Sequence, residues 1–168
     1  VSVPGHDDKG EARFYIGNEL IGDTLRDNTY EADGYRFHDA IHIALAAGLG
    51  WSPVLRSLLR RKRKTSPVID EVEDGGRAII LDEVVCVLIH DYITQHDDEL
   101  ATQQIDHDFV AILQRLTSHL EVVDRSADDW WRSILLASRL FNETREWDGA
   151  SVVVNLRLGT AIATPIGC

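Results

Sequence analysis

The chain has 168 residues, of which 44% are hydrophobic, so its length and composition suit one globular domain with a substantial core. Its formal net charge is -11 and its pI is about 4.9, so the surface repels nucleic-acid backbones and anionic membranes, and we expect neither as a partner. Two cysteines, Cys86 and Cys168, are too few for a disulfide framework, and no apolar run reaches the roughly 20 residues that span a bilayer, so we expect a cytoplasmic protein.

A β-hairpin is the first element that the sequence predicts. It follows a flexible tail at residues 1–10, and its alternating residues 11–22 turn at Gly17 and Asn18. Apolar side chains then recur at helical spacing over residues 35–49, which predicts the first helix.

Two further helices are predicted on either side of a basic block, RRKRK, at residues 60–64. Ser52 and Pro53 supply an N-cap and a first-turn proline for the helix that precedes the block. The helix that follows is expected to run unbroken over residues 70–95, with acidic first turns and an apolar second half. The glycine pair 75–76 weakens this helix by about 1 kcal/mol per glycine relative to alanine, which indicates a tight approach by another helix or a ligand.

The last third of the chain adds two helices and the end of the sheet. Residues 106–120 carry apolar side chains on one side of a helix, and Ser126 with Asp129 resembles a capping box for the next helix. Residues 149–163 are expected to form one or two strands that pair with the first hairpin. The predicted fold is mainly α, with about five helices and a small antiparallel β-sheet from the two ends, in a single domain of residues 11–168.

The stretch YEADGYRFHDAIH, residues 30–42, carries the first candidate site. On a helix, His38 and His42 are four residues apart and Asp39 and His42 are three apart, so their side chains lie on adjacent turns of one side. This spacing offers two imidazoles, or an imidazole and a carboxylate, to one cation. The alternative is that His38 forms a hydrogen bond to a loop and His42 is an ordinary histidine at the core boundary.

The acidic stretch DEVEDGGRAIILDEV, residues 70–84, carries the second candidate site. Glu71 and Asp74 are three residues apart, and Asp82 follows two turns later on a similar side. Carboxylates on facing helices suit Mg²⁺, which takes oxygen ligands and bridges substrate phosphates. The alternative is an ordinary acidic first turn, although Asp82 and Glu83 lie within an apolar stretch where a buried carboxylate needs an arginine or a metal as partner.

The basic block provides the third candidate site. In a chain of charge -11, Arg61 and Lys62, with Arg36 from the first helix, are the natural ligands for an anionic substrate. The alternative is a solvated helix end, where basic residues suit the helix dipole. Trp51 lies between the first two helices and either stacks on a base or belongs to the core.

Two segments resemble the region that follows the pyrophosphohydrolase domain in some MazG-type proteins. They are DNTYEADGYRFHDAIHIALAAGLGWSPVLRSLLRRKRK, residues 27–64, and DEVEDGGRAIILDE, residues 70–83, and the resemblance runs over residues 11–158. It implies an all-helical and usually oligomeric protein. MazG-type enzymes use Mg²⁺ held by carboxylates to cut nucleoside triphosphates into monophosphate and pyrophosphate.

The resemblance carries the family's metal ligands over at one position. A MazG catalytic core combines a helix with E-E-x-x-E and a helix with E-x-x-D, and Asp39 falls at the aspartate of the second pattern. Arg36 stands where that pattern has its glutamate, and the acidic residues 71–74 come in the reverse chain order. His38 and His42 have no counterpart in the pattern.

The first functional hypothesis is therefore a divalent-metal-dependent nucleotide pyrophosphohydrolase that forms a homo-oligomer. The residues expected to hold the Mg²⁺ or Mn²⁺ ion are His38, Asp39, His42, Glu71 and Asp74. Those expected to take part in catalysis are Asp39, Glu73 and Glu83, and those expected to bind the nucleotide are Arg36, Trp51, Arg61 and Lys62. The alternative hypothesis is a non-catalytic nucleotide-binding or oligomerisation module that accompanies a MazG-type catalytic domain.

Overall fold

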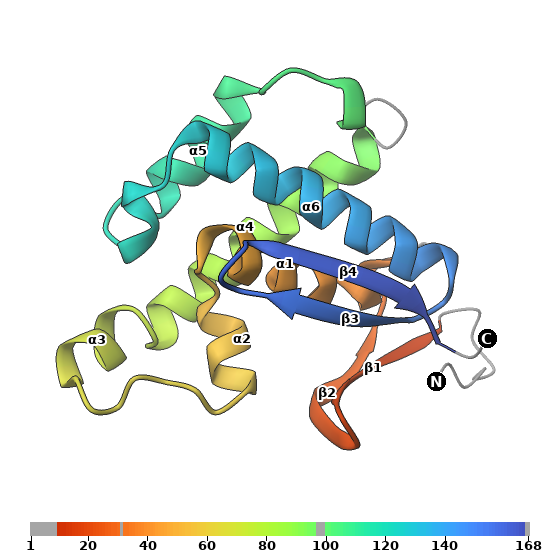
Figure 1. The fold of residues 1–168 in the computed structure, drawn as a ribbon, viewed down its shortest axis with the longest axis horizontal. Helices are drawn as coiled ribbons and strands as arrows, with labels where there is room; N and C mark the ends of the chain where they lie inside the picture. The colour runs from red at the N-terminus through yellow and green to blue at the C-terminus, as the bar shows by residue number, and fades with distance from the viewer. Residues whose placement is uncertain (1–9, 31, 97–99, 167–168) are drawn as a thin grey trace.

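A computed structural model describes residues 10–30, 32–96 and 100–166 of the chain (Figure 1). The tail expected at residues 1–10 lies, except for Gly10, outside the described residues. The strands are β1 Glu11–Ile16, β2 Glu19–Arg26, β3 Ala150–Asn155 and β4 Thr160–Pro165. The α-helices are α1 Asp39–Leu49, α2 Pro53–Leu58, α3 Pro67–Val72, α4 Gly76–Gln95, α5 His107–Leu116 and α6 Ala127–Glu146. Short 3-10 helices are η1 Tyr35–Phe37, η2 Leu100–Thr102 and η3 Glu121–Asp124. The prediction of a mainly α fold is confirmed.

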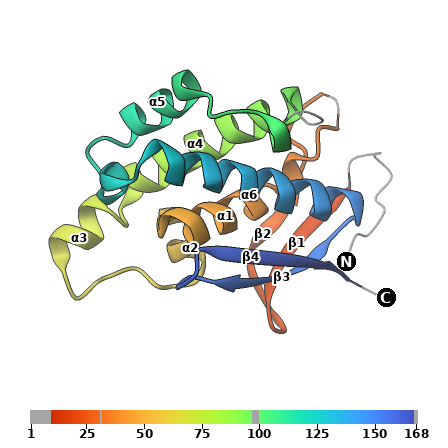
Figure 2. The ribbon, with the colours of Figure 1, turned by 45° about the horizontal axis from the view of Figure 1, so that its top comes forward.

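Helix α1 lies at the centre of the molecule. It packs against α2, α4, α6 and the hairpin β3–β4, and Figures 1 and 2 show it enclosed between them. Its buried residues occur on every side of the helix, which is typical of a helix in the middle of a core. One of them is the polar residue His42, so its ring needs partners inside the protein.

Helices α2 and α6 begin where their sequences predict, and α6 packs as predicted. Ser52 caps α2 by accepting a hydrogen bond from the backbone of Leu55, and Pro53 occupies the first turn. Ser126 and Asp129 form the predicted capping box at the start of α6. The core-facing side of α6 is fully buried, as its spacing indicates, at Trp130, Ile134, Ala137 and Phe141.

The prediction of one unbroken helix over residues 70–95 is wrong. The chain forms α3 and then α4, and the break falls at residues 73–75. A Cβ on Gly75 would lie 2.0 Å from the carbonyl oxygen of Glu71, so only glycine fits this tight turn. Gly76 has open space around it. The close approach that we expected at the glycine pair is therefore made by the chain's own preceding turn.

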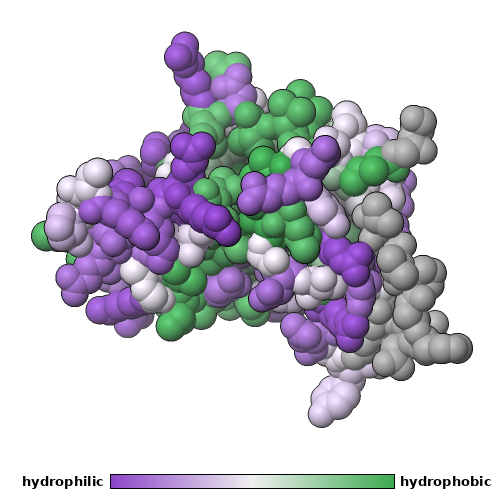
Figure 3. Space-filling view, turned by 90° about the horizontal axis from the view of Figure 1, so that it is seen from below, coloured by the Kyte–Doolittle hydropathy of each residue, from purple (hydrophilic) through white to green (hydrophobic). Residues whose placement is uncertain are grey.

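The two ends of the chain form separate sheets rather than one. Strands β1 and β2 pair antiparallel around Gly17, as expected, while β3 pairs with β4. The expected pairing between the two hairpins is therefore wrong. Val153 and Ile162 face each other across β3 and β4 and remain exposed, and Figure 3 shows hydrophobic side chains gathered on the face that it presents. Among the residues described, none of the helices has the length and apolarity needed to cross a bilayer.

A close contact between α1 and α6 gives the first prediction. A Cβ on Gly48 would lie 2.2 Å from Oγ and 3.1 Å from Cβ of Ser133, whose hydroxyl is held by the carbonyl of Asp129. We expect Gly48→Ala to lower the free energy of unfolding by about 1–2 kcal/mol, because overpacking outweighs the gain in helix propensity. Gly76→Ala is the matched control and should be neutral or stabilising. Urea unfolding of both variants measures the difference, and equal stability of the two would contradict the close packing.

Candidate metal centre

Three side chains from two helices converge at the start of α1. His38 precedes the first residue of α1, His42 lies one turn later, and Glu83 comes from α4. One ligand atom of each lies within 4.8 Å of the others, and among the described residues this is the one group of histidine, cysteine and acidic side chains that fits a metal ion. His42 is completely buried, whereas the side chain of Glu83 is 44% exposed, so the group opens to the surface on the side of Glu83.

Asp82 fixes the orientation of the His42 ring. The Nδ1 of His42 donates to Oδ1 of Asp82 at 3.0 Å, because a carboxylate accepts. The other oxygen of Asp82 accepts 2.7 Å from the hydroxyl of Ser52 and 3.0 Å from the backbone amide of Val54. The Nε2 of His42 therefore points toward Glu83, whose Oε2 lies 3.6 Å away. This nitrogen is buried and has no hydrogen-bond partner in the described part of the chain.

A backbone carbonyl fixes the orientation of the His38 ring. Its Nδ1 donates to the carbonyl oxygen of Tyr35 at 2.8 Å, which leaves its Nε2 available as a ligand atom. The ring stacks on that of Tyr35, with centroids 4.4 Å apart and planes 8° apart. A left-handed Gly34 lets the chain enter the turn that places Tyr35 and His38 there.

The charges of the site act strongly on one another. Burial alone would lower the pKa of His42, but Cys86 and Asp82 beside it raise that pKa well above its usual value. Contact with His42 lowers the pKa of Glu83. Burial raises the pKa of Asp39, although His38 and His42 oppose the rise. The side chain of Asp39 has no hydrogen bond or ion pair with any other described residue, so it is available to a ligand.

The donor set fits a divalent transition metal. Two imidazoles and one carboxylate are typical ligands of Zn²⁺, Mn²⁺ or related ions, whereas Mg²⁺ prefers oxygen ligands and several waters. Ligand atoms about 2.0–2.2 Å from an ion lie less than about 4.4 Å apart, so small side-chain movements would bring this group to coordinating distance. Each histidine already has the outer hydrogen bond that usually accompanies a metal-bound imidazole.

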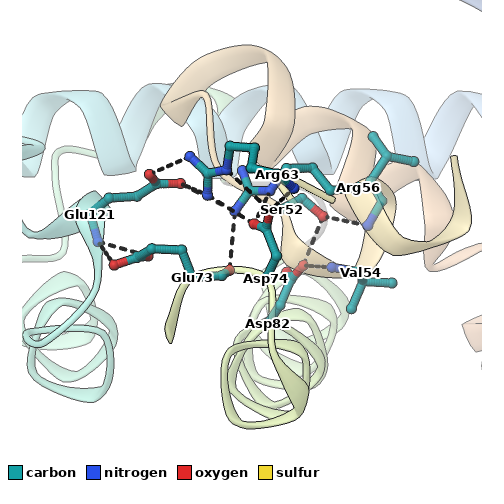
Figure 4. Close-up of polar contacts among 9 residues, drawn as sticks. Ser52, Val54, Arg56, Arg63, Glu73, Asp74, Asp82 and Glu121 are labelled. Atoms are coloured by element: carbon teal, nitrogen blue, oxygen red, sulfur yellow. Dashed lines mark hydrogen bonds and ion pairs between the residues drawn. The ribbon is translucent and has the colours of Figure 1, made fainter. Parts of the chain in front are cut away.

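The second candidate site is instead an ion-pair network (Figure 4). Asp74 is completely buried, and its two oxygens accept hydrogen bonds from Nε of Arg56 and from the backbone amide, Nε and Nη2 of Arg63. Burial alone would raise the pKa of Asp74, but the bonds from Arg63 and the charge of Arg56 lower it to about 2. These partners leave Asp74 no oxygen for a metal.

The same network reaches the segment after α5. Arg63 donates from both terminal nitrogens to Glu121, at 2.8 and 3.0 Å, so Figure 4 shows Asp74 and Glu121 on two sides of its guanidinium. Glu73 accepts from the backbone amide of Glu121. Asp74, which was expected to hold the metal, is therefore bonded to Arg56 and Arg63. Glu73, which was expected to take part in catalysis, is bonded to the backbone of Glu121, and neither acid belongs to the histidine group.

The remaining predicted residues lie apart from the cluster or are engaged elsewhere. Arg36 pairs with the buried Asp27 at 2.7 Å and with Asp148 at 3.5 Å. Trp51 is 1% exposed and belongs to the core. Three side chains make no hydrogen bond or ion pair with another described residue, namely Glu71 in α3 and Arg61 and Lys62 in the connection from α2 to α3.

The sequence did not reveal how the site is supported. An arginine or a metal was the expected partner of the buried Asp82 carboxylate, whereas its partners are a histidine, a hydroxyl and a backbone amide. Ser52 was identified as a helix cap, but its second bond to Asp82 has no local sequence signal. Glu121 lies 58 residues after Arg63, so only the fold brings it to Arg56 and Arg63.

One comparison with known proteins gives a match. The family model of the MazG C-terminal domain matches residues 3–163, which is nearly the whole chain. Neither the curated proteins nor the solved structures contain a match.

The Asp74 network gives a prediction about acid stability. The folded pKa of Asp74 is about 2, below its value of about 3.9 in an unfolded chain. Its contribution is therefore present above about pH 4 and is lost as the pH falls toward about 2. Asp74→Asn should lower the free energy of unfolding by about 3 kcal/mol at pH 7, because Arg56 and Arg63 lose their buried carboxylate partner. The loss should be distinctly smaller at pH 3. Urea unfolding at the two pH values measures this.

Glu71→Gln is the control for Asp74→Asn, since Glu71 lies in the same acidic stretch but is exposed. It should change the free energy of unfolding by less than about 0.5 kcal/mol at either pH. A cost for Asp74→Asn that does not shrink in acid would show that the carboxylate charge is not what stabilises the fold.

The cluster itself predicts binding of one divalent ion. We expect Co²⁺ or Mn²⁺ to bind the purified chain, and His38→Gln, His42→Gln and Glu83→Gln each to weaken that binding by a factor of at least about 10. His96→Gln is a matched control, because His96 also donates from Nδ1 to a backbone carbonyl, at 2.8 Å, but lies outside the cluster. Calorimetry and the visible spectrum of Co²⁺ report the result. Equal binding by all four variants would rule the cluster out.

Proposed function

Because the chain belongs to the MazG C-terminal domain family, we propose that it works in nucleotide hydrolysis, with a divalent transition metal held by His38, His42 and Glu83. The observation that supports this best is the convergence of three ligand atoms whose histidines are already oriented by hydrogen bonds. The proposed reaction is the cleavage of a nucleoside triphosphate to monophosphate and pyrophosphate.

The roles follow from the positions of the side chains. His38, His42 and Glu83 would hold the divalent ion, which would supply an activated water and polarise a phosphoryl oxygen. Asp39, which has no partner in the described part of the chain, accepts the proton of the attacking water. The new bond joins the water oxygen to the α-phosphorus, and pyrophosphate leaves as the anhydride bond breaks. The donor set favours Mn²⁺ over the Mg²⁺ that the family resemblance implies.

A second function is favoured by the state of the expected substrate ligands. Arg36 is already held by Asp27 and Asp148, and Trp51 is buried in the core. Arg61 and Lys62 stay proposed phosphate contacts. A module that binds metal but does not catalyse, and that accompanies a MazG-type catalytic domain, needs none of these residues. The two functions share the metal centre and differ in turnover.

Turnover is tested through Asp39. Wild-type protein with Mn²⁺ should release pyrophosphate from at least one of the common ribonucleoside and deoxyribonucleoside triphosphates. Asp39→Asn should lower that rate by about 10²–10⁴-fold, because the proton acceptor is lost, while metal binding and the melting temperature change little. His96→Gln should keep the wild-type rate.

Two results would decide against the catalytic function. Metal-loaded wild type that releases no pyrophosphate from any nucleotide would favour the non-catalytic module. Full activity of Asp39→Asn would remove Asp39 from the reaction. Light scattering on the same samples reports whether the chain forms the homo-oligomer that the family resemblance implies.

A further inference from the structure

A second concave surface lies between α4 and α5, away from the metal centre. It has a volume of about 570 Å³, which falls within the usual range for small-molecule sites. Its lining residues are Arg77, Leu81, Ile112, Arg115, Leu116 and His119. Arg77 and Leu81 are four residues apart on α4, while the others follow one side of α5 into the turn after it.

The charge of this groove is opposite to that of the molecule. The chain has 28 acidic and 17 basic residues, yet the groove is lined by two arginines and a histidine and by no acidic side chain. Within the described residues, the guanidinium groups of Arg77 and Arg115 form no hydrogen bond or ion pair. Both arginines are exposed on the same hollow, and an anionic ligand between them would offset the repulsion of their like charges.

The backbone adds to the attraction for an anion. Arg77 lies in the first turn of α4, a helix of 20 residues whose N-cap, Gly75, supplies no side-chain cap. Among the described residues, no side chain accepts a hydrogen bond from the amides of that turn, and the helix dipole places positive potential at the same end. The guanidinium pair and the helix end both offer positive charge and N–H donors, which are the groups that bind phosphate.

The floor of the groove is apolar. Leu81, Ile112 and Leu116 line it, and Ile112 is 53% exposed. A bare inorganic ion would leave this surface in water, whereas a ligand with an apolar or aromatic part would cover it. The groove therefore suits a molecule that carries its phosphate at one end and an apolar body at the other.

We propose that the groove between α4 and α5 binds the phosphate group of a small organic molecule, with Arg77, Arg115 and His119 as donors and the aliphatic floor against its apolar part. The site is distinct from the metal centre, since Leu81 and Glu83 project from α4 about 200° apart. It requires neither the metal nor turnover, so it does not rest on the proposed hydrolysis.

The test is a titration of the full chain, with EDTA present to empty the metal centre, followed by NMR. The probes are phenyl phosphate, inorganic phosphate and phenol, which separate the phosphate from the apolar body. Phenyl phosphate should bind more tightly than inorganic phosphate, shift the side-chain resonances of Arg77, Arg115 and His119, and bind less tightly as salt is added. Phenol should produce no such shifts. Adenosine monophosphate, as a further probe, reports whether a nucleoside also fits as the organic part.

Charge-neutral variants decide whether these residues are responsible. Arg77→Gln and Arg115→Gln should each weaken phenyl phosphate binding by about tenfold, as expected for the loss of a charged hydrogen bond. The double variant Arg132→Gln/Arg157→Gln removes two exposed positive charges elsewhere and should bind like wild type. Ile112→Ser should reduce the advantage of phenyl phosphate over inorganic phosphate.

Three outcomes would overturn the proposal. The first is no shift at the groove with any phosphate probe. The second is unchanged affinity in both arginine variants. The third is equal loss of affinity in the Arg132→Gln/Arg157→Gln control, which would mean that overall charge is responsible. Failure of the pyrophosphate assay would leave this result untouched, because the titration is carried out without metal.

Discussion

The buried carboxylate of Asp82 holds together the part of the molecule on which the rest depends. It accepts hydrogen bonds from His42 on α1, from the hydroxyl of Ser52 and from the amide of Val54 at the start of α2. Burying a carboxylate is costly unless each oxygen is satisfied, and here both oxygens are. Because α1 is surrounded by α4, α6 and the second hairpin, the His42 ring is buried, and Asp82 gives its Nδ1 a hydrogen-bond partner. The side chain of Asp82 thus orients the His42 ring toward Glu83, and it also links α1, α2 and α4.

Two polar networks lie along the same part of the chain, one just before α4 and one within it. The Asp74 network, before α4, joins three segments by ion pairs, and every charge in it has a partner. Within the described residues, Nε2 of His42 is buried and has no hydrogen-bond partner, and the side chain of Asp39 at the start of α1 forms no hydrogen bond. Satisfied charges are typical of structural sites, and unsatisfied convergent donors are typical of ligand sites. This contrast separates the acidic stretch of residues 70–74, where Asp74 is held in ion pairs, from the histidine stretch, which stays the candidate site.

Local signals in the sequence predicted most of the fold. Ser52, Ser126 and Asp129 mark helix starts by their own side-chain bonds, so no distant residue was needed to identify them. The break at Gly75 was missed because a glycine in a helical pattern has two explanations, and only the 2.0 Å approach of a carbonyl oxygen distinguishes them. The pairing of the two hairpins was predicted wrongly, because alternation identifies strands but not their partners.

The candidate site was predictable in its local half only. The spacing of His38 and His42 on one helix indicated a shared ligand, but Glu83 lies 41 residues after His42 and needed the fold to bring it there. Glu71 and Asp74 were grouped with the histidines because an acidic pair at helical spacing looks the same whether it faces an arginine or a metal. The arginines that answer this question, Arg56 and Arg63, belong to a basic region whose ion pairs cannot be read from spacing.

The two hydrogen bonds of the Ser52 hydroxyl have a consequence for how the protein unfolds locally. The hydroxyl accepts a hydrogen bond from the amide of Leu55 and so caps the first turn of α2. It also donates to Asp82, the carboxylate that orients His42. Arg56, one residue after Leu55, holds Asp74 at the other network. Local unfolding of α2 therefore breaks the support of the His42 ring and one of the ion pairs of Asp74 in the same event. The two networks, although separate in chemistry, belong to one cooperative unit, and a ligand that orders His42 also protects the amides of α2 from exchange with solvent.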